Sequence, residues 1–504
     1  MILRKGVLGV FIIVLLFGLY YVGFDLLGPT TGTIISIFST LSVISIGFII
    51  FIDNRQPAVT MAWILLLALL PVVGVFFYFW FGQNVFKRHK YEKKAKRDRQ
   101  VYQMIENAGM LTALDLSSFR EDHQLLLRLS QNLAVTPVSQ ATETTILTNG
   151  GQTFTALLEA LETAEHHIHM EYYIYRADDI GTRIQQILIE KAQQGIEVRF
   201  MVDAVGSMQL PRLFLQEMRE AGVQVGVFGE ARILLLSSQV NYRNHRKIVV
   251  IDGNIGFIGG LNVGDEYLSR SQTYGFWRDT HMQIKGEGVR TLQIIFLQDW
   301  LHVTGETCLD QVYFSPRLIA SQGGAVQIIA SGPDNDLRVL KHVFFSMITS
   351  AKRSVWLATP YFIPDESILT ALRMAALSGL DVRILFPGKP DKRLPFYASH
   401  SYFVTLLEAG VRIYEYEKGF LHSKLLIVDG EIATIGTANM DMRSFHLNFE
   451  VNALLVETES VHQMVRNFER DLNSASLIIQ DRFARRKVMQ RLVESAARLI
   501  SPML

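Results

Sequence analysis

Two segments of this sequence share one spacing of residues that can bind and cleave a phosphodiester. They read His245-x-Lys247-x4-Asp252-x6-Gly259-Gly260-x-Asn262 and His422-x-Lys424-x4-Asp429-x6-Gly436-Thr437-x-Asn439. Residues two apart on a strand face the same way, so each His projects together with its Lys. A single His-x-Lys pair would more often be a surface feature, but a double match of this length is very improbable by chance. The repetition predicts two half-sites that form one active site.

Histidine can act as a nucleophile or as a general acid when a partner on its second ring nitrogen fixes its tautomer. The candidate partners are Asp279 in "WRDTH" and Glu450 in "SFHLNFEVN", each at the start of an apolar-alternating strand. These strands should return beside the two histidines, although carboxylates at strand ends can also be simple surface groups. We therefore expect Asp279 and Glu450 to orient the catalytic imidazoles.

The other motif residues suit the binding of a phosphate without a metal ion or a cofactor. Preorganised cations and amide or hydroxyl groups can stabilise charge that develops on phosphate oxygens. We expect this role for Lys247, Lys424, Asn262, Asn439 and Thr437.

Asp252 and Asp429 belong to the motif and are included among the candidate catalytic residues. Each is followed by glycine, and Asp-Gly is the strongest short hairpin signal. This position favours a structural role in a turn, after which the next strand brings Asn262 or Asn439 back toward His and Lys.

The elements around the motifs are duplicated as well. Segments 164–175, 194–203 and 221–228 precede the first motif, and segments 351–364, 378–387 and 409–416 precede the second in the same order. Apolar strands that alternate with amphipathic helices predict an α/β sandwich with a mixed sheet in each half. Two like halves usually meet face to face, so we expect the site to lie around a pseudo-twofold axis.

The composition indicates that part of the chain lies in lipid. Of 504 residues, 49% are hydrophobic, and the mean hydropathy is +0.21. Three uncharged stretches, 6–24, 34–52 and 58–81, are each near the roughly 20 residues that a membrane helix needs. We expect three spans rather than two spans with an interfacial first helix. The basic run at 87–99 then places the catalytic part in the cytoplasm, and it also suits anionic lipid.

Charge and cysteine content narrow the remaining classes. Lys and Arg number 49 against 48 Asp and Glu, so the net charge does not indicate a nucleic-acid partner. The single cysteine, Cys308, excludes an intrachain disulfide framework. We expect a membrane domain over 1–86, a basic linker with helices over 87–135, and repeats over 136–320 and 321–504. The last repeat ends in a basic amphipathic helix that either packs on the domain or lies at a lipid surface.

The paired motifs resemble the signature of the phospholipase D superfamily over about residues 140–480. Four further segments resemble bacterial cardiolipin synthases: "WILLLALLPVVGVFFYFWFG" (63–82), "WRDTH" (277–281), "DMRSFHLNFEVN" (441–452) and "ESAARLISPML" (494–504). The resemblance implies two phospholipase D-like repeats after N-terminal transmembrane helices. One departure is Gly260, where the common form has Ser.

The resemblance also implies a reaction. Two phosphatidylglycerol molecules would give cardiolipin and glycerol, reversibly, through a phosphatidyl-histidine and without metal or nucleotide. By the same resemblance His245 is the nucleophile and His422 the acid and base, a choice that the symmetry of the motifs leaves open. The expected partners are phosphatidylglycerol and anionic membrane lipids, not nucleic acid, at a multi-pass location in the cell membrane.

Three alternatives use the same residues. The first is a phospholipase D or a phosphatidyltransferase with another alcohol acceptor, because the motifs do not specify the acceptor. The second is a metal-free nuclease, which the apolar spans and the lack of a long basic groove disfavour. The third is a membrane scaffold without activity, which would not explain why both motifs keep His, Lys and Asn.

Overall fold

The computed structural model describes residues 40–41, 43–48, 50–51, 57–69, 74, 78, 85–107, 114–229, 241–317, 319–321, 323–335 and 337–500. Residue contacts divide the chain into two units, Met1–Lys90 and Tyr91–Leu504. In the first unit the helix α3 covers Pro57–Leu69. Among the described residues, no helix combines the length and the hydropathy that a membrane crossing requires. The predicted span 6–24 lies outside the described residues, and the spans 34–52 and 58–81 fall on them only in part.

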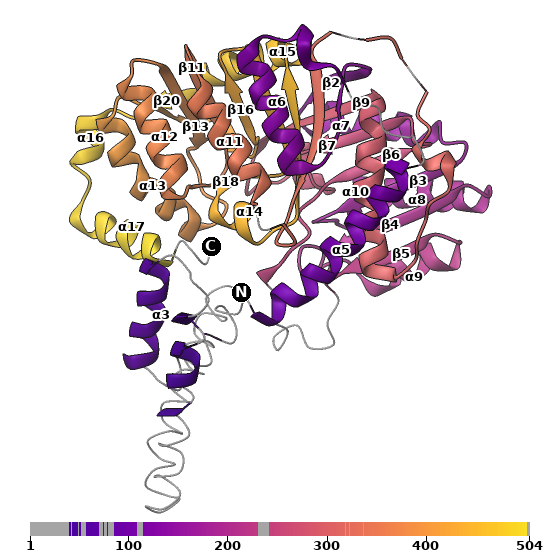
Figure 1. Cartoon of the computed structure of the whole chain (residues 1–504), viewed down its shortest axis with the longest axis horizontal. Helices are drawn as coiled ribbons and strands as arrows, with labels where there is room; N and C mark the ends of the chain where they lie inside the picture. Colours follow the sequence, from indigo (N-terminus) through magenta and orange to yellow (C-terminus); the bar gives the residue numbers. More distant parts are fainter. Residues whose placement is uncertain are drawn as a thin grey trace, which may run out of the picture. The chain divides into compact units, whose positions relative to one another are not determined.

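The second unit contains both repeats, each built on a mixed sheet (Figure 1). The first sheet has the order β2 (Thr142–Thr148), β9 (Thr280–Gly286), β7 (Ile255–Gly259), β6 (Ile248–Ile251), β3 (His167–Tyr172), β4 (Glu197–Asp203) and β5 (Gln224–Phe228). Its outer face is covered by α7 (Asn149–Glu162), α8 (Asp179–Gln193) and α9 (Arg212–Glu220).

The second sheet repeats this order and adds a strand at each edge. It runs β1 (Val138–Ser139), β10 (Ala325–Ser331), β19 (Glu450–Val456), β17 (Ile432–Gly436), β16 (Leu425–Val428), β11 (Ser354–Ala358), β13 (Asp381–Pro387), β14 (Arg412–Tyr416) and β20 (Ala475–Leu477). Its outer face is covered by α6 (Glu121–Ala134), α11 (Val339–Ser350), α12 (Glu366–Leu377) and α13 (Arg393–Glu408). The predicted α/β repeats with mixed sheets are thereby confirmed.

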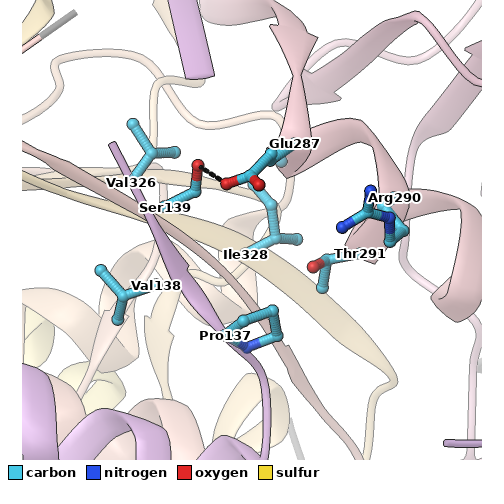
Figure 2. Close-up of a pocket in the computed structure, with 9 residues that line it drawn as sticks. Pro137, Val138, Ser139, Glu287, Arg290, Thr291, Val326 and Ile328 are labelled. Carbon is cyan, nitrogen blue, oxygen red and sulfur yellow. Dashed lines mark hydrogen bonds between the residues drawn. The ribbon is translucent and has the colours of Figure 1, made fainter. Parts of the chain in front are cut away.

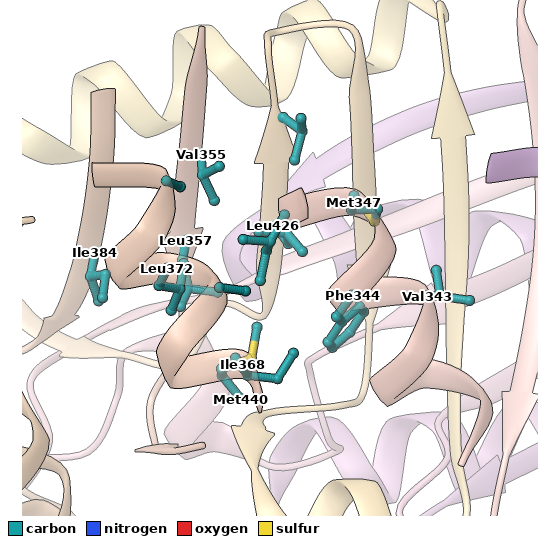
Figure 3. Packing of buried hydrophobic residues seen from close by; sticks show 14 of the residues in the cluster. Val343, Phe344, Met347, Val355, Leu357, Ile368, Leu372, Ile384, Leu426 and Met440 are labelled. Carbon is teal, nitrogen blue, oxygen red and sulfur yellow. The ribbon is translucent and has the colours of Figure 1, made fainter. Parts of the chain in front are cut away.

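Apolar side chains hold the layers together. Figure 3 shows Phe344 of α11 and Ile368 and Leu372 of α12 against Leu357 and Leu426 of the second sheet. Each such buried side chain contributes about 1.5–3 kcal/mol relative to an exposed one. A second core between the sheets includes α10 (Glu287–Thr304) and α15 (Glu459–Leu472) and joins strands of both repeats. The two repeats therefore share one interior.

The helix α5 (Val85–Asn107) contains the basic run, and one of its lysines is not a surface charge. Lys94 is 3% exposed. Its Nζ lies 2.5 Å from Asp98, 3.1 Å from Asp299 and 3.4 Å from Asp334. Burial alone would lower the pKa of Lys94, but the three carboxylates outweigh it and raise the pKa. The interpretation of the whole run as a topology and lipid signal is therefore wrong for Lys94, which neutralises buried acids.

Replacing this lysine should destabilise the second unit. Lys94→Ala leaves Asp299 buried with one cation fewer, and breaking a buried ion pair costs about 3–5 kcal/mol. We expect a clearly lower melting temperature in a thermal shift assay of the purified full-length protein. The matched control is Lys96→Ala, which removes an exposed lysine of the same helix. Equal melting temperatures for the two variants would contradict this role of Lys94.

Candidate active site

Each histidine is fixed by the backbone of the opposite repeat. The strand β15 (Gly419–Leu421) pairs in parallel with β8 (Phe276–Arg278), and the amide of His422 donates to the carbonyl of Arg278 at 2.7 Å. Reciprocally, the amide of His245 donates to the carbonyl of Phe449 at 2.9 Å. Arg278 and Phe449 directly precede the candidate carboxylates, so each histidine lies beside the carboxylate of the other repeat.

The carboxylates orient the imidazoles across the repeats. Nδ1 of His245 lies 2.9 Å from Oε2 of Glu450, and Nδ1 of His422 lies 2.6 Å from Oδ2 of Asp279. Sequence order places each carboxylate after the histidine of its own repeat, and the structure exchanges them. Both carboxylates are fully buried, whereas each histidine side chain keeps 11% of its surface exposed. This arrangement fixes the tautomers and leaves Nε2 of both rings for chemistry.

Both histidines are neutral in the free site, because burial disfavours their charged form. Burial lowers the pKa of His245 to about 4, although the charge of Glu450 opposes this shift. Burial and the charge of Lys424 lower the pKa of His422 to about 4, although Asp279 opposes it. Lys424 also lowers the pKa of His245, and Lys247 lowers that of His422. The two half-sites are thus within electrostatic reach of each other and form one composite site.

The two lysines hold the positive charge of the site. Burial lowers the pKa of Lys247 to about 7 and that of Lys424 to about 8. Nζ of Lys247 donates to the carbonyl of His245 at 2.6 Å, and Nζ of Lys424 donates to the carbonyl of His422 at 2.5 Å. Nζ of Lys424 also lies 3.3 Å from Nε2 of His422. An anion that enters this site therefore meets cations already placed beside the reactive nitrogens.

Two aromatic rings shield the imidazoles. The ring of Tyr173 lies 4.9 Å from that of His245, and Trp277 lies 5.1 Å from His422. Nζ of Lys247 also lies 5.5 Å from the centroid of Tyr173. Sequence analysis did not single out Tyr173, and the only available signal was its position in the apolar run that ends β3. These rings place apolar surface directly beside the two imidazoles.

The polar residues expected to bind phosphate have different surroundings. Oδ1 of Asn262 accepts from the amide of Ile174 at 3.1 Å, and its Nδ2 donates to the hydroxyl of Tyr267 at 3.3 Å. Asn439 is also buried, but its Oδ1 has no hydrogen-bond partner among the described residues. This Oδ1 atom of Asn439 is an acceptor, so it suits a hydroxyl group of a substrate and not a phosphate oxygen.

Thr437 acts on a carboxylate. Its hydroxyl donates to Oε2 of Glu450 at 2.5 Å and accepts from the amide of Val451 at 2.9 Å. In place of the expected substrate contact, the geometry makes Thr437 a positioning residue for Glu450. At the equivalent position a Cβ on Gly260 would lie 2.1 Å from Oδ1 of Asp279. The departure from the common motif follows from this lack of space.

The structure corrects the catalytic assignment of Asp252 and Asp429. The carboxylate of Asp252 accepts from the amides of 165–167 at 2.8–2.9 Å, and that of Asp429 accepts from those of 352–354 at 2.7–2.9 Å. Both residues have positive φ, 52° and 55°, and the glycine after each is also left-handed. Since β6 and β16 separate them from His245 and His422, they are structural residues of the hairpin turns, as their Asp-Gly position favoured.

Two further polar residues lie behind the site and were missed. His281 of β9 and Asn452 of β19 each follow the orienting carboxylate by two residues, and Asn452 shares the side of β19 that carries Glu450. Nδ1 of His281 and Nδ2 of Asn452 are buried without a hydrogen-bond partner among the described residues. A cavity of about 10 Å³ is lined by both Asn452 and Lys424. The alternation of the strand was the signal that could have identified this pair.

Another small cavity lies between the repeats. It has a volume of about 10 Å³ and is bordered by β1, β10 and the start of α10. Figure 2 shows Ser139 and Glu287 at this cavity, joined by a hydrogen bond of 2.8 Å. None of its lining residues belongs to the paired motifs, and one water molecule would fill it. The cavity is therefore not a lipid site.

The duplicated fold and its composite site define the class of the protein, the phospholipase D superfamily. A family model described as "Cardiolipin synthase, PLD-like domain" matches residues 157–300 and 344–472, and a "Phospholipase_D-nuclease N-terminal" model matches residues 40–83. Within the superfamily, this chain belongs to the cardiolipin synthase family. The predicted resemblance is thereby confirmed.

Individual proteins agree with this assignment. A cardiolipin synthase of Geobacillus sp. (strain WCH70) is 55% identical over 471 residues, which are 93% of this chain and 94% of that protein. A cardiolipin synthase of Alkalihalophilus pseudofirmus is 53% identical over 502 residues, 99% of both chains. The crystal structure of a phosphatidylserine synthase of Haemophilus influenzae Rd KW20 covers 77% of this chain and 100% of its own, with a TM-score of 0.57 and 14% identity. That likeness concerns the fold alone.

Proposed function

We propose that this enzyme transfers a phosphatidyl group from one phosphatidylglycerol molecule to another and releases glycerol. The observation that carries the proposal is the reciprocal pair of carboxylate-oriented histidines, His245 with Glu450 and His422 with Asp279. Membership in the cardiolipin synthase family, with relatives of that name above 50% identity, supports the choice of substrate.

In the first half-reaction, Nε2 of His245 attacks the phosphorus, and the bond from phosphorus to the glycerol oxygen breaks. His422 donates a proton to that oxygen, so glycerol leaves as a neutral alcohol. Glu450 stabilises the positive charge that develops on the imidazole of His245, because its own pKa is held low by His245 and Lys247 despite burial. The products are glycerol and a phosphatidyl-His245 intermediate.

In the second half-reaction, neutral His422 accepts the proton of the terminal hydroxyl of a second phosphatidylglycerol. The freed oxygen attacks phosphorus, the bond to His245 breaks, and cardiolipin forms. Both half-reactions exchange an alcohol oxygen and His245 at the same phosphorus, in opposite directions. The whole transfer is therefore reversible. The aromatic rings of Tyr173 and Trp277 favour the lipid alcohol over water as the acceptor.

In the free site the lysines are protonated and His422 is neutral. His422 gains the proton for the first step when the anionic substrate binds. A phosphodiester carries a negative charge, which favours the protonated forms of Lys247, Lys424 and His422. Nζ of Lys424 lies 2.9 Å from Nδ1 and 3.3 Å from Nε2 of His422, so its charge opposes protonation of this imidazole until an anion binds between them. The low pKa of His422 in the free site therefore does not prevent it from acting as an acid in the complex.

The pKa values predict the pH dependence of kcat/KM, which reports the free enzyme. As the pH rises through about 7 and about 8, Lys247 and Lys424 lose the protons with which they bind the anionic phosphate, so kcat/KM falls. As the pH falls through about 4, His245 becomes protonated and can no longer attack. Initial rates at subsaturating phosphatidylglycerol should therefore be highest between these limits. A kcat/KM that rises from pH 7 to pH 9 would contradict the role of the lysines.

The activity itself is tested with purified protein and phosphatidylglycerol as the only lipid. We expect equimolar cardiolipin and glycerol, measured by mass spectrometry and an enzymatic glycerol assay. Exclusive formation of phosphatidic acid would instead identify a phospholipase D. Addition of ethanolamine or serine to the same reaction tests other acceptors, and their phosphatidyl esters should remain minor products.

We propose a cellular location from the N-terminal residues. We place the catalytic part in the cytoplasm behind a multi-pass membrane domain over 1–86, with a basic linker and helices over 87–135 and repeats over 136–320 and 321–504. The support is the apolar stretches of the sequence, the N-terminal family model over 40–83, and the exposed Lys93, Lys96 and Arg97 of α5. Proteolysis of sealed inside-out vesicles should cleave the repeats, and proteolysis of right-side-out vesicles should spare them.

A further inference from the structure

The C-terminal helix α17 (Val488–Ile500) has its amphipathic faces inverted relative to an ordinary surface helix. Its Glu494 is 2% exposed and accepts from Nη2 of Arg486 at 2.8 Å. By contrast, Leu492 and Leu499 on the same helix are 58% and 83% exposed. The helix contacts the core of the second repeat through the small side chain of Ala497, while its larger apolar side chains at 488, 489, 492 and 499 stay exposed.

The exposed apolar residues form one continuous face. Val488, Leu492 and Leu499 follow each other at intervals of four and seven residues, and Met489 lies beside them. Val488 is 71% and Met489 70% exposed. Because these intervals keep side chains on one side of a helix, the face is a stripe and not a set of scattered residues.

Basic residues border this apolar stripe. Lys487 and Arg491, four residues apart, are exposed along one edge of the helix, and Arg482 and Arg485 are exposed just before it. Among the described residues from 480 to 500, Asp481 is the only exposed acid. The charge on this part of the surface is therefore suited to an anionic partner.

We infer that α17 docks on the surface of a bilayer that contains anionic phospholipid. The apolar stripe of Val488, Met489, Leu492 and Leu499 enters the boundary between headgroups and acyl chains, and the basic residues bind the phosphates. Docking on a second copy of the chain is disfavoured, because a twofold pairing of α17 would bring together two surfaces that both carry the exposed basic residues 482, 485, 487 and 491. A free phosphate would not account for the apolar stripe.

The position of α17 relates this surface to the active site. Figure 1 shows α17 at the end of the second repeat where α14 (Met442–His446) also lies. The helix α14 begins three residues after Asn439 of the second motif. A bilayer under α17 would hold this end of the repeat at the lipid surface. The inference concerns where the catalytic unit binds lipid, and it does not depend on which histidine is the nucleophile.

Depth-dependent quenching in the full-length chain tests the inference. In a Cys308→Ser background, Leu499→Cys is labelled with an environment-sensitive dye and reconstituted in vesicles of phosphatidylglycerol and phosphatidylcholine, with or without brominated acyl chains. We expect a blue shift and strong quenching by the brominated lipid, both reduced in pure phosphatidylcholine. The matched control is a dye at Leu213→Cys in α9, since Leu213 is 62% exposed and lies in the other repeat.

Equal spectra and equal quenching at positions 499 and 213 would overturn the inference. A second outcome would also overturn it. If energy transfer between dyes at position 499 grows with protein density and brominated lipid has no effect, a second copy of the chain covers the helix.

The effect on turnover separates this surface from the reaction. The double variant Leu492→Asp with Leu499→Asp should form cardiolipin several-fold more slowly from phosphatidylglycerol in vesicles and at the unchanged rate from detergent micelles. Leu213→Asp should match the unsubstituted protein in both. An equal rate of the double variant and the unsubstituted protein in vesicles would contradict docking. If the unsubstituted protein forms no cardiolipin in vesicles and none in micelles, the proposed function is contradicted instead.

Discussion

Replacing either motif histidine with Asn is expected to lower the rate of cardiolipin formation by about 10⁴-fold, because one variant lacks the nucleophile and the other lacks the acid. Both rings contact buried carboxylates, and Asn keeps an N–H group that can still donate to the carboxylate but has no nucleophilic or basic ring nitrogen. The measurement is the initial rate of cardiolipin release by mass spectrometry. His462→Asn, which replaces an exposed histidine of α15, is the control and should retain full activity.

An activated substrate distinguishes the two roles. In phosphatidyl-p-nitrophenol the leaving group departs as an anion and needs no acid. His422→Asn should therefore release one equivalent of nitrophenol and accumulate a phosphatidyl adduct on His245, detectable by peptide mass spectrometry. His245→Asn should release none above background. An adduct on His422 in the unsubstituted protein would exchange the assignments, and near-normal turnover of either variant would reject the two-histidine mechanism.

The repeat and its motifs were predictable because short segments of the sequence determine them. Side-chain alternation placed each His and Lys on one side of a strand, and the Asp-Gly signals predicted the two hairpins, which the structure contains between β6 and β7 and between β16 and β17. The hairpin position also favours a structural role for Asp252 and Asp429 over a catalytic one. The hydrogen bonds of both carboxylates to backbone amides agree with that preference.

The assignment of partners across the repeats was not predictable in this way. Which carboxylate meets which histidine depends on the docking of two whole repeats, and no local pattern near Glu450 or Asp279 encodes it. The same holds for Lys94, whose neighbours in the sequence are exposed cations and whose partners Asp299 and Asp334 lie far along the chain. Thr437 was assigned to substrate because its contact with Glu450 becomes visible only when β17 pairs with β19.

The exchange of carboxylates leads to the second large expected effect. Glu450→Gln should lower cardiolipin formation by about 10³–10⁴-fold. The amide fixes the wrong tautomer of His245 and does not balance the charge of the imidazolium. A comparable carboxylate-to-amide change in a serine protease triad costs about 10⁴-fold. Asp279→Asn should have an effect of similar size through His422. Glu459→Gln, which replaces a carboxylate with 77% side-chain exposure, is the control.

The activated substrate shows which histidine each carboxylate serves. If Glu450 orients the nucleophile His245, Glu450→Gln should slow the release of p-nitrophenol as strongly as it slows cardiolipin formation. If Asp279 orients the acid His422, Asp279→Asn should spare this release and impair only the transfer to the acceptor lipid, which still needs a base. The opposite result, with release lost in Asp279→Asn, retained in Glu450→Gln and the adduct still on His245, would mean that each carboxylate serves its own repeat. The two repeats would then function as separate half-sites, and the crossed hydrogen bonds of the His245 and His422 amides would have no catalytic consequence.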